Sequence, residues 1–156
     1  MLLKTRPTAI AAGVILALAA GAVLAQSSAE AVIKARKAHM QLQAFNLGPL
    51  GAMAKGEMPY DAAQASAAAG NLAALVSMNM GRYFPEGSAQ GQAEGTRALP
   101  AIWENGEDVM AKVAALNEAV TALNATAGTD LASLQGAMGA VGEACGACHK
   151  AYRAPE

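Results

Sequence analysis

The C-terminal part of the chain carries the pattern that most limits how it can fold. Apolar, thiol and aromatic residues recur there at alternating three- and four-residue steps, namely Leu131, Leu134, Met138, Val141, Cys145, Cys148 and Tyr152. Residues spaced in this way share one face of an α-helix. Thr129 or Asp130 can cap the start of this helix. Such a face is buried against other helices, so the pattern predicts a helical bundle.

Helical periodicity also covers most of the preceding sequence. It predicts four helices in all, over residues 28–54, 61–80, 100–127 and about 129–152, with a long loop over 82–99. Ser27 or Ser28 is the expected N-cap of the first helix, and Gly81 the expected C-cap of the second. Gly48-Pro49 should kink the first helix or end it early. The short links favour an all-α, antiparallel, up-down-up-down four-helix bundle.

The composition agrees with this fold class. The chain is 54% hydrophobic but only 4% aromatic, which is typical of closely packed helices and not of a sandwich or a barrel. The formal net charge is −1. The broad positive field that nucleic-acid binding requires is absent, so we expect no nucleic-acid partner.

The N-terminus has the features of a secretory signal peptide. Lys4 and Arg6 precede an uncharged apolar run, Ala9 to Ala25, which ends in the small-residue pattern Val23-Leu24-Ala25. We expect a signal peptide over 1–25 and a mature domain over 26–156. Cleavage after Ala22 and an uncleaved anchor are the alternatives, although 17 apolar residues fall short of the roughly 20 that span a bilayer. Cleavage removes two positive charges, lowers the net charge from −1 to −3, and favours basic or dipolar partners.

The segment Cys145-Gly146-Ala147-Cys148-His149 carries the chemistry of the chain. Two thiols three residues apart, followed by histidine, match the requirement for covalent attachment of a c-type haem. A redox dithiol would lie at a helix N-terminus in a βαβ unit, and structural zinc would need four ligands. The spacing therefore predicts one covalent haem c, attached through Cys145 and Cys148, with His149 as the proximal iron ligand, inside the bundle.

The second axial position of the iron is less determined by the sequence. Seven methionines follow Met1, and most of them are expected to fill the core. Met40 lies midway along the first predicted helix, on a face formed by Ile33, Arg36, Met40, Ala44 and Leu47. His39 is the rival ligand, but it is displaced by about 100° around the helix, so we expect it at the surface or in a groove. Periodicity alone leaves Met40, another side chain and an open position as alternatives.

Three segments together resemble the class II cytochromes c, which include cytochrome c′ and the low-spin cytochrome c-556 type. The segment 145–153 (CGACHKAYR) resembles the family's terminal signature, 55–63 (KGEMPYDAA) its first interhelical connector, and 100–103 (PAIW) the start of its third helix. The resemblance covers essentially all of residues 26–156. It implies a four-helix bundle, often dimeric through its first two helices.

The resemblance also implies roles for individual residues. Counting back from the connector places Met40 at the distal position facing the iron, where five-coordinate relatives carry a bulky apolar residue, often leucine. Arg36 matches an arginine near a haem propionate. Arg153 matches an arginine close to the haem and the proximal histidine. Solvated surface cations are the alternative interpretation for both arginines.

These features predict an electron carrier and not an enzyme. A His/Met-ligated low-spin iron has no open site for substrate and suits one-electron transfer between periplasmic redox proteins. The main alternative is a five-coordinate, cytochrome c′-like binder of nitric oxide or carbon monoxide. A peroxidase-like enzyme, which would have to use His39, and a haem-free protein with a Cys145–Cys148 disulfide are weaker alternatives.

Overall fold

The computed structural model describes the backbone of residues 10–155 and the side chains of residues 29–155. Its elements are α1 (Ile10–Lys55), α2 (Ala62–Val76), η1 (a 3₁₀ helix, Met80–Tyr83), α3 (Ala101–Glu104), α4 (Gly106–Thr126) and α5 (Leu131–Tyr152). No strand is present between residues 10 and 155, and the predicted all-α class is confirmed.

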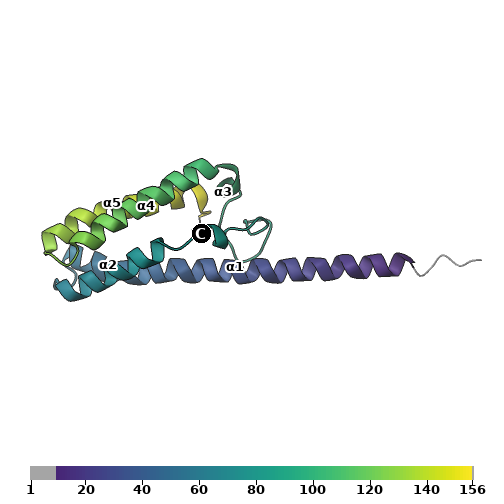
Figure 1. The fold of residues 1–156 in the computed structure, drawn as a ribbon, viewed down its shortest axis with the longest axis horizontal. Helices are drawn as coiled ribbons and strands as arrows, with labels where there is room; N and C mark the ends of the chain where they lie inside the picture. Colours follow the sequence, from purple (N-terminus) through teal and green to yellow (C-terminus); the bar gives the residue numbers. More distant parts are fainter. Residues whose placement is uncertain (1–9, 156) are drawn as a thin grey trace, which may run out of the picture.

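Four of these helices form the predicted bundle (Figure 1). The neighbouring pairs are α1 with α2, α2 with α4, α4 with α5 and α5 with α1, which closes an up-down-up-down ring. The fully buried side chains of the core come from all four helices, and the largest are Leu50, Met53, Leu72, Val120, Leu123, Leu134 and Val141. Figure 1 shows η1, α3, the long loop and the C-terminus gathered at one end of the bundle, beyond which α1 extends.

The inner face predicted for residues 131–152 is confirmed. Leu134, Val141 and Tyr152 are buried, while Cys145 and Cys148 are half-buried. Asp130 caps α5 by accepting a hydrogen bond from the backbone N–H of Ser133 at 2.7 Å. The sequence spacing therefore positions both thiols on the interior side of the last helix.

Two interhelical connections explain how the other end of the bundle closes. Asp61 caps α2 by accepting a hydrogen bond from the backbone N–H of Gln64 at 2.9 Å. The preceding Tyr60 donates its hydroxyl to the carbonyl of Ala127 at 2.9 Å, at the turn between α4 and α5. This bond joins the two turns across the bundle end opposite the long loop.

The boundaries predicted for the first helix are wrong at its start. Residues 1–9 of the expected signal peptide lie outside the described residues, but α1 is continuous from Ile10, without an N-cap at Ser27 or Ser28. Nothing between 10 and 28 breaks a helix. The helix also continues through Pro49 to Lys55. Pro49 lacks a backbone N–H, so the helix loses only the hydrogen bond to the carbonyl of Phe45. That carbonyl lies on an exposed side of α1, where water can donate to it instead.

Two other predicted helices are shorter or divided. The second ends at Val76 with Ser77 as its C-cap, where the Ser77 hydroxyl donates to the carbonyl of Ala74 at 2.8 Å, and Gly81 lies inside η1 instead of capping α2. The third is divided into α3 and α4 at Asn105, whose backbone leaves the helical region.

The inward face of α1 differs from the predicted one and is more polar. Ala44 is exposed, whereas Arg36, His39, Gln43 and Asn46 are buried. The expectation that His39 lies at the surface is wrong, since its side chain is only 4% exposed. The cause is η1, which packs beside α1 and covers the face that bears His39. Among the residues that the structure describes, none of the helices is long and apolar enough to span a bilayer.

Candidate haem site

A cavity of about 310 Å³ lies at the end of the bundle where α1, α5 and the long loop meet. Five of the six predicted site residues line it: Arg36, Met40, Cys148, His149 and Arg153. The other lining residues are Lys37, Gln41, Phe84, Gly95, Thr96, Arg97, Ala98, Ile102 and Tyr152. The sixth predicted residue, Cys145, is half-buried one turn earlier in α5 and packs against the hydrophobic core.

The two candidate iron ligands enter this cavity from different helices. Met40 comes from α1 and His149 from α5, and both side chains are half-buried. Burial lowers the pKa of His149, and the charges of Arg153 and Arg97 lower it further. The imidazole is therefore neutral near pH 7, which is the form that coordinates a metal.

His39 has a different environment from Met40. It does not line the cavity; its ring stacks on Tyr83 with 5.2 Å between the ring centroids and 32° between the planes. Its Nε2 is buried and has no hydrogen-bond partner, and burial lowers the pKa of the imidazole. Of these two neighbouring side chains, only Met40 therefore faces the candidate site.

The thiols do not have the properties of a redox pair. Both are free, and burial is the largest cause that raises the pKa of Cys145 and of Cys148. A reactive dithiol would need a lowered thiol pKa. Within the described part of the chain, no group of three or more His, Cys, Asp or Glu side chains is placed to hold a metal ion, which disfavours structural zinc there.

The long loop contributes one wall of the cavity, and it is attached to the end of α5. The backbone N–H of Leu99 donates to the carbonyl of Tyr152 at 3.0 Å, and that of Ala154 donates to the carbonyl of Arg97 at 2.9 Å. The Arg97 Nε also donates to the carbonyl of Ala154 at 2.8 Å. This short antiparallel pairing is not visible in the sequence, because a single bridge between Ala98 and Arg153 has no periodic signature.

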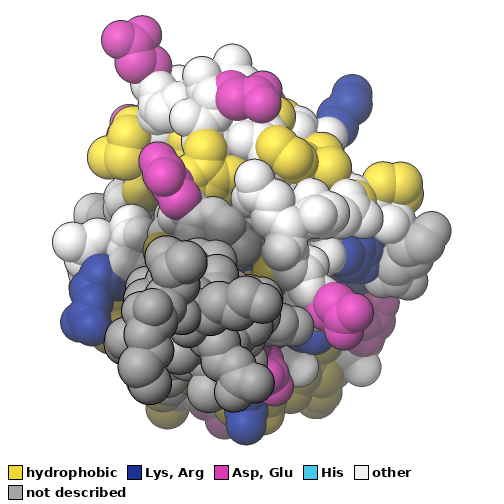
Figure 2. All heavy atoms as spheres, turned by 90° about the vertical axis from the view of Figure 1, so that its right-hand side faces the viewer, with side chains coloured by type: hydrophobic (Ala, Val, Ile, Leu, Met, Phe, Trp, Pro, Cys, Tyr) yellow, Lys and Arg dark blue, Asp and Glu magenta, His cyan; other side chains and the backbone are white. Residues whose placement is uncertain are grey.

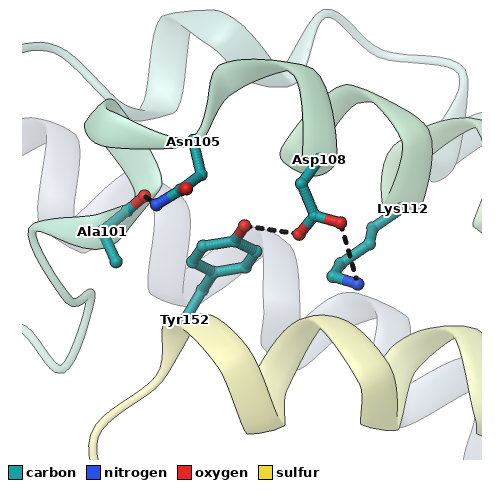
Figure 3. A network of polar contacts seen from close by, with 5 residues as sticks. All are labelled: Ala101, Asn105, Asp108, Lys112 and Tyr152. Atoms are coloured by element: carbon teal, nitrogen blue, oxygen red, sulfur yellow. Dashed lines mark hydrogen bonds and ion pairs between the residues drawn. The ribbon is translucent and has the colours of Figure 1, made fainter.

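A polar network beside the cavity links α5 to α4 (Figure 3). Tyr152 donates its hydroxyl to Asp108 at 2.5 Å, and Asp108 forms an ion pair with Lys112 at 3.4 Å. The Tyr152 bond is the largest cause that lowers the pKa of Asp108, and the same bond raises the pKa of Tyr152 to about 12. Sequence analysis missed both Asp108 and Lys112, since their spacing on α4 predicts only a local i,i+4 pair.

The network predicts a pH-dependent contribution to stability. A lowered Asp108 pKa stabilises the fold above the unfolded value of about 3.9, and this contribution is lost as pH falls through the folded pKa. A raised Tyr152 pKa stabilises the fold below the unfolded value of about 10, and this contribution is lost as pH rises through about 12. Tyr152→Phe should therefore lower the melting temperature most between roughly pH 5 and 9, with a smaller difference at both extremes.

Thermal unfolding of the haem-loaded protein across pH, at constant ionic strength, measures this effect. Asn105→Ala is the control, because its amide donates only to the carbonyl of Ala101 at 2.9 Å and does not titrate. If the difference in melting temperature between Tyr152→Phe and the wild type is constant across the whole pH range, the hydrogen bond between Tyr152 and Asp108 is not the source of the pH dependence.

Comparison with known proteins gives the site its context. The family model of cytochrome c′ matches residues 31–153. The chain belongs to the cytochrome c′ family. It is 53% identical to cytochrome c-554 of Cereibacter sphaeroides over 80% of this chain and 81% of that protein. It is 39% identical to cytochrome c-556 of Agrobacterium fabrum over 98% of this chain and 97% of that protein.

Solved structures of cytochrome c′ have the same fold. A cytochrome c′ of a Rhodobacter species superposes with a TM-score of 0.80 at 42% identity, covering 82% of this chain and 98% of that one. A variant of cytochrome c′ from Alcaligenes xylosoxidans, solved with bound NO, superposes with a TM-score of 0.71 at 32% identity. It covers 82% of this chain and 97% of that one.

Membership of the cytochrome c′ family makes haem c the cofactor of this chain, which is a monohaem cytochrome. The residues present fit that group. The only two cysteines of the chain are Cys145 and Cys148, one helical turn apart on α5. Phe84, Ala98 and Ile102 provide apolar surface in the cavity, and its lining also includes the cations that two propionates require.

Proposed function

We propose that this cytochrome is a periplasmic one-electron carrier, in which His149 and Met40 would both hold the haem iron. The observation that carries the proposal is that Met40 and His149 line one cavity from two helices, while His39 packs away from it against Tyr83. The similarity to cytochrome c-556 adds support. The resemblance to class II cytochromes c implies methionine at this position in the low-spin c-556 type.

The protein supplies the surroundings in which electron transfer is fast. When bound, haem supplies one-electron chemistry, through an iron that alternates between the ferrous and ferric states. The thioether of Met40 is a neutral, soft ligand that favours the ferrous state, and the imidazole of His149 is held neutral by burial. Phe84, Ala98 and Ile102 line the cavity with apolar surface. No acid, base or nucleophile is needed, so the chain acts as a carrier and not as an enzyme.

The site residues share the remaining tasks. Cys145 and Cys148 hold the haem covalently on α5. Arg153, exposed at the end of α5, supplies positive charge beside His149, whose pKa it lowers. Lys37 on α1 lines the same cavity and supplies a second cation at its rim.

Periplasmic location rests on the N-terminal sequence. The charged start, the apolar run from Ala9 to Ala25 and the Val23-Leu24-Ala25 pattern support export with cleavage after Ala25. Covalent haem attachment takes place outside the cytoplasm, so export is consistent with the cofactor. Mass spectrometry of the purified mature chain tests the cleavage site.

Docking with redox partners should be small and transient. Figure 2 shows acidic and basic side chains interspersed over the described part of the end of the molecule toward which α1 extends. Such a surface suits brief encounters with a dipolar partner protein better than tight binding to a strongly charged one.

Visible spectra of the oxidised and reduced protein, with and without carbon monoxide, test the proposed ligation. We expect low-spin spectra in both states and weak or slow carbon monoxide binding, because Met40 occupies the position that the gas needs. A high-spin spectrum of the untreated protein would reject Met40 as a ligand.

Gas binding is the second candidate function. It is favoured by the similarity to cytochrome c′ of Alcaligenes xylosoxidans, of which one variant was solved with bound NO and another with bound carbon monoxide. The same spectra separate the two functions, since a five-coordinate iron is high-spin and binds carbon monoxide without displacing a ligand.

We also propose that two copies pair through α1 and α2. The outward side of α1 carries an apolar stripe at strict three- and four-residue steps: Ala31, Ala35, Ala38, Leu42, Phe45, Pro49 and Ala52. Leu42 is 52% and Phe45 77% exposed. A heptad of this kind on a free face is typical of a helix that packs against another helix.

A further inference from the structure

The loop between η1 and α3 forms one wall of the candidate haem cavity. Phe84 and residues 95–98 from this loop line the cavity. The loop has little regular structure of its own, so its position depends on contacts with the helices. Trp103 in α3 donates its indole N–H to the carbonyl of Phe84 at 3.0 Å, which holds one side of the loop.

Arg36 holds the other side. Its Nη1 donates to the carbonyl of Tyr83 at 3.1 Å and to Ser88 Oγ at 3.3 Å. Its Nη2 donates to the carbonyl of Ser88 at 3.1 Å and to Thr96 Oγ1 at 2.6 Å. The guanidinium also lies over the Phe84 ring, 4.7 Å from its centroid. One side chain of α1 therefore contacts the beginning, the middle and the end of the loop.

The hydrogen-bond capacity of Arg36 is almost fully used by these contacts. A guanidinium has five N–H donors in a fixed plane. The four bonds from Nη1 and Nη2 account for four of them and leave the Nε–H. The side chain is only 6% exposed. Lysine, with three donors on a single nitrogen, cannot reproduce this planar set of contacts.

We propose that Arg36 is a positioning residue, whose guanidinium fastens the loop over 83–96 to α1 and so builds one wall of the haem cavity. This role adds to the one near a propionate that the family resemblance implies for Arg36. Arg36 lines the cavity together with the other cations Lys37, Arg97 and Arg153. The proposal concerns the haem site of the proposed function and rests on haem occupying it.

Hydrogen exchange of the haem-loaded protein tests the proposal, with Arg36→Lys and Arg36→Gln as the variants. Three loop amides report on the wall: Gln90, Ala93 and Leu99, whose N–H groups donate to the carbonyls of Ala98, Ala89 and Tyr152. We expect these amides to exchange about tenfold faster or more in both variants. Lysine keeps the positive charge but cannot make the four hydrogen bonds to the loop, and glutamine keeps neither. Amides in the middle of α4 should be unchanged.

The reduction potential separates the two roles of Arg36. If Arg36 acted only as a propionate partner, it would act through its charge. Arg36→Lys would then retain both the wild-type reduction potential and the slow exchange of the loop amides, and Arg36→Gln would shift the potential without changing that exchange. That combination would overturn the proposal. Unchanged loop exchange in both variants would overturn it as well.

A second variant tests the clamp from the loop side. Thr96→Val removes the Oγ1 that accepts from Arg36 Nη2 at 2.6 Å and from the backbone N–H of Ala98 at 3.1 Å, and it leaves the guanidinium in place. Because the lost Ala98 bond acts locally on Gln90 and Leu99, Ala93 is the reporter in this variant: faster exchange at Ala93, with an unchanged spectrum, supports the clamp, and unchanged exchange contradicts it. Lys37→Gln is the matched control, because it removes a neighbouring exposed cation of the same cavity and should leave loop exchange unchanged. The loop measurement does not depend on spin state, so failure of Met40 ligation and failure of the clamp give different results.

Discussion

Met40→Leu is expected to convert a six-coordinate low-spin haem protein into a five-coordinate high-spin one. Leucine fills nearly the same volume as methionine but has no donor atom for iron, and such a swap usually costs less than about 1.5 kcal/mol of stability. Carbon monoxide should bind about 10- to 100-fold more tightly, because a ligated Met40 leaves only a minor fraction of the sites open. Visible spectra and a carbon monoxide titration of the reduced protein measure both changes.

His39→Ala is the matched control for this experiment. The two residues are adjacent in sequence, but only Met40 lines the cavity. We expect the His39 variant to keep the wild-type spectrum. The reverse result, with the spectrum changed by His39→Ala and not by Met40→Leu, would identify His39 as the iron ligand.

Phe45→Glu is expected to dissociate the proposed dimer. The substitution removes an aromatic anchor and places a carboxylate on the apolar stripe of α1, where the second copy contributes the same charge. Loss of one central contact residue typically costs about 2–4 kcal/mol, which corresponds to a roughly 30- to 1,000-fold higher dissociation constant. Sedimentation equilibrium over a range of protein concentrations measures this constant.

Met110→Glu controls for the general effect of a new surface charge. Met110 is 66% exposed, but it lies on α4, outside the stripe. We expect no change in its oligomeric state. A wild-type protein that stays monomeric at every accessible concentration would contradict the dimer, and equal dissociation by both variants would show that the stripe has no special role.

The bundle was predictable because its helices have periodic local sequence. The three- and four-residue steps from Leu131 to Tyr152 are sufficient to place Val141 inside and the two thiols on the inner face of α5. Periodicity put Met40 on one face of the first predicted helix, and the resemblance to class II cytochromes c implied its distal position. The structure brings Met40 and His149 to one cavity. Periodicity could not decide between a ligated and an open iron, since ligation depends on atoms outside the helix pattern.

The loop wall was not predictable, for a physical reason. Arg36 donates to acceptors 47 to 60 residues away in the chain, and three of its four hydrogen bonds go to Ser88 and Thr96, which are ordinary polar residues in sequence. The burial of His39 depends on the neighbouring 3₁₀ helix η1, because the ring of Tyr83 packs on the imidazole. Contacts between a helix and an irregular segment leave no spacing signature that a sequence pattern can detect.

The position of Cys145 has a consequence for the order in which this protein is made. This thiol lies one turn before the cavity, is half-buried and packs against the hydrophobic core. We therefore expect the bond between this sulfur and the haem to form more readily while α5 is still separated from its neighbours. On this expectation, haem attachment precedes the packing of the bundle around the haem.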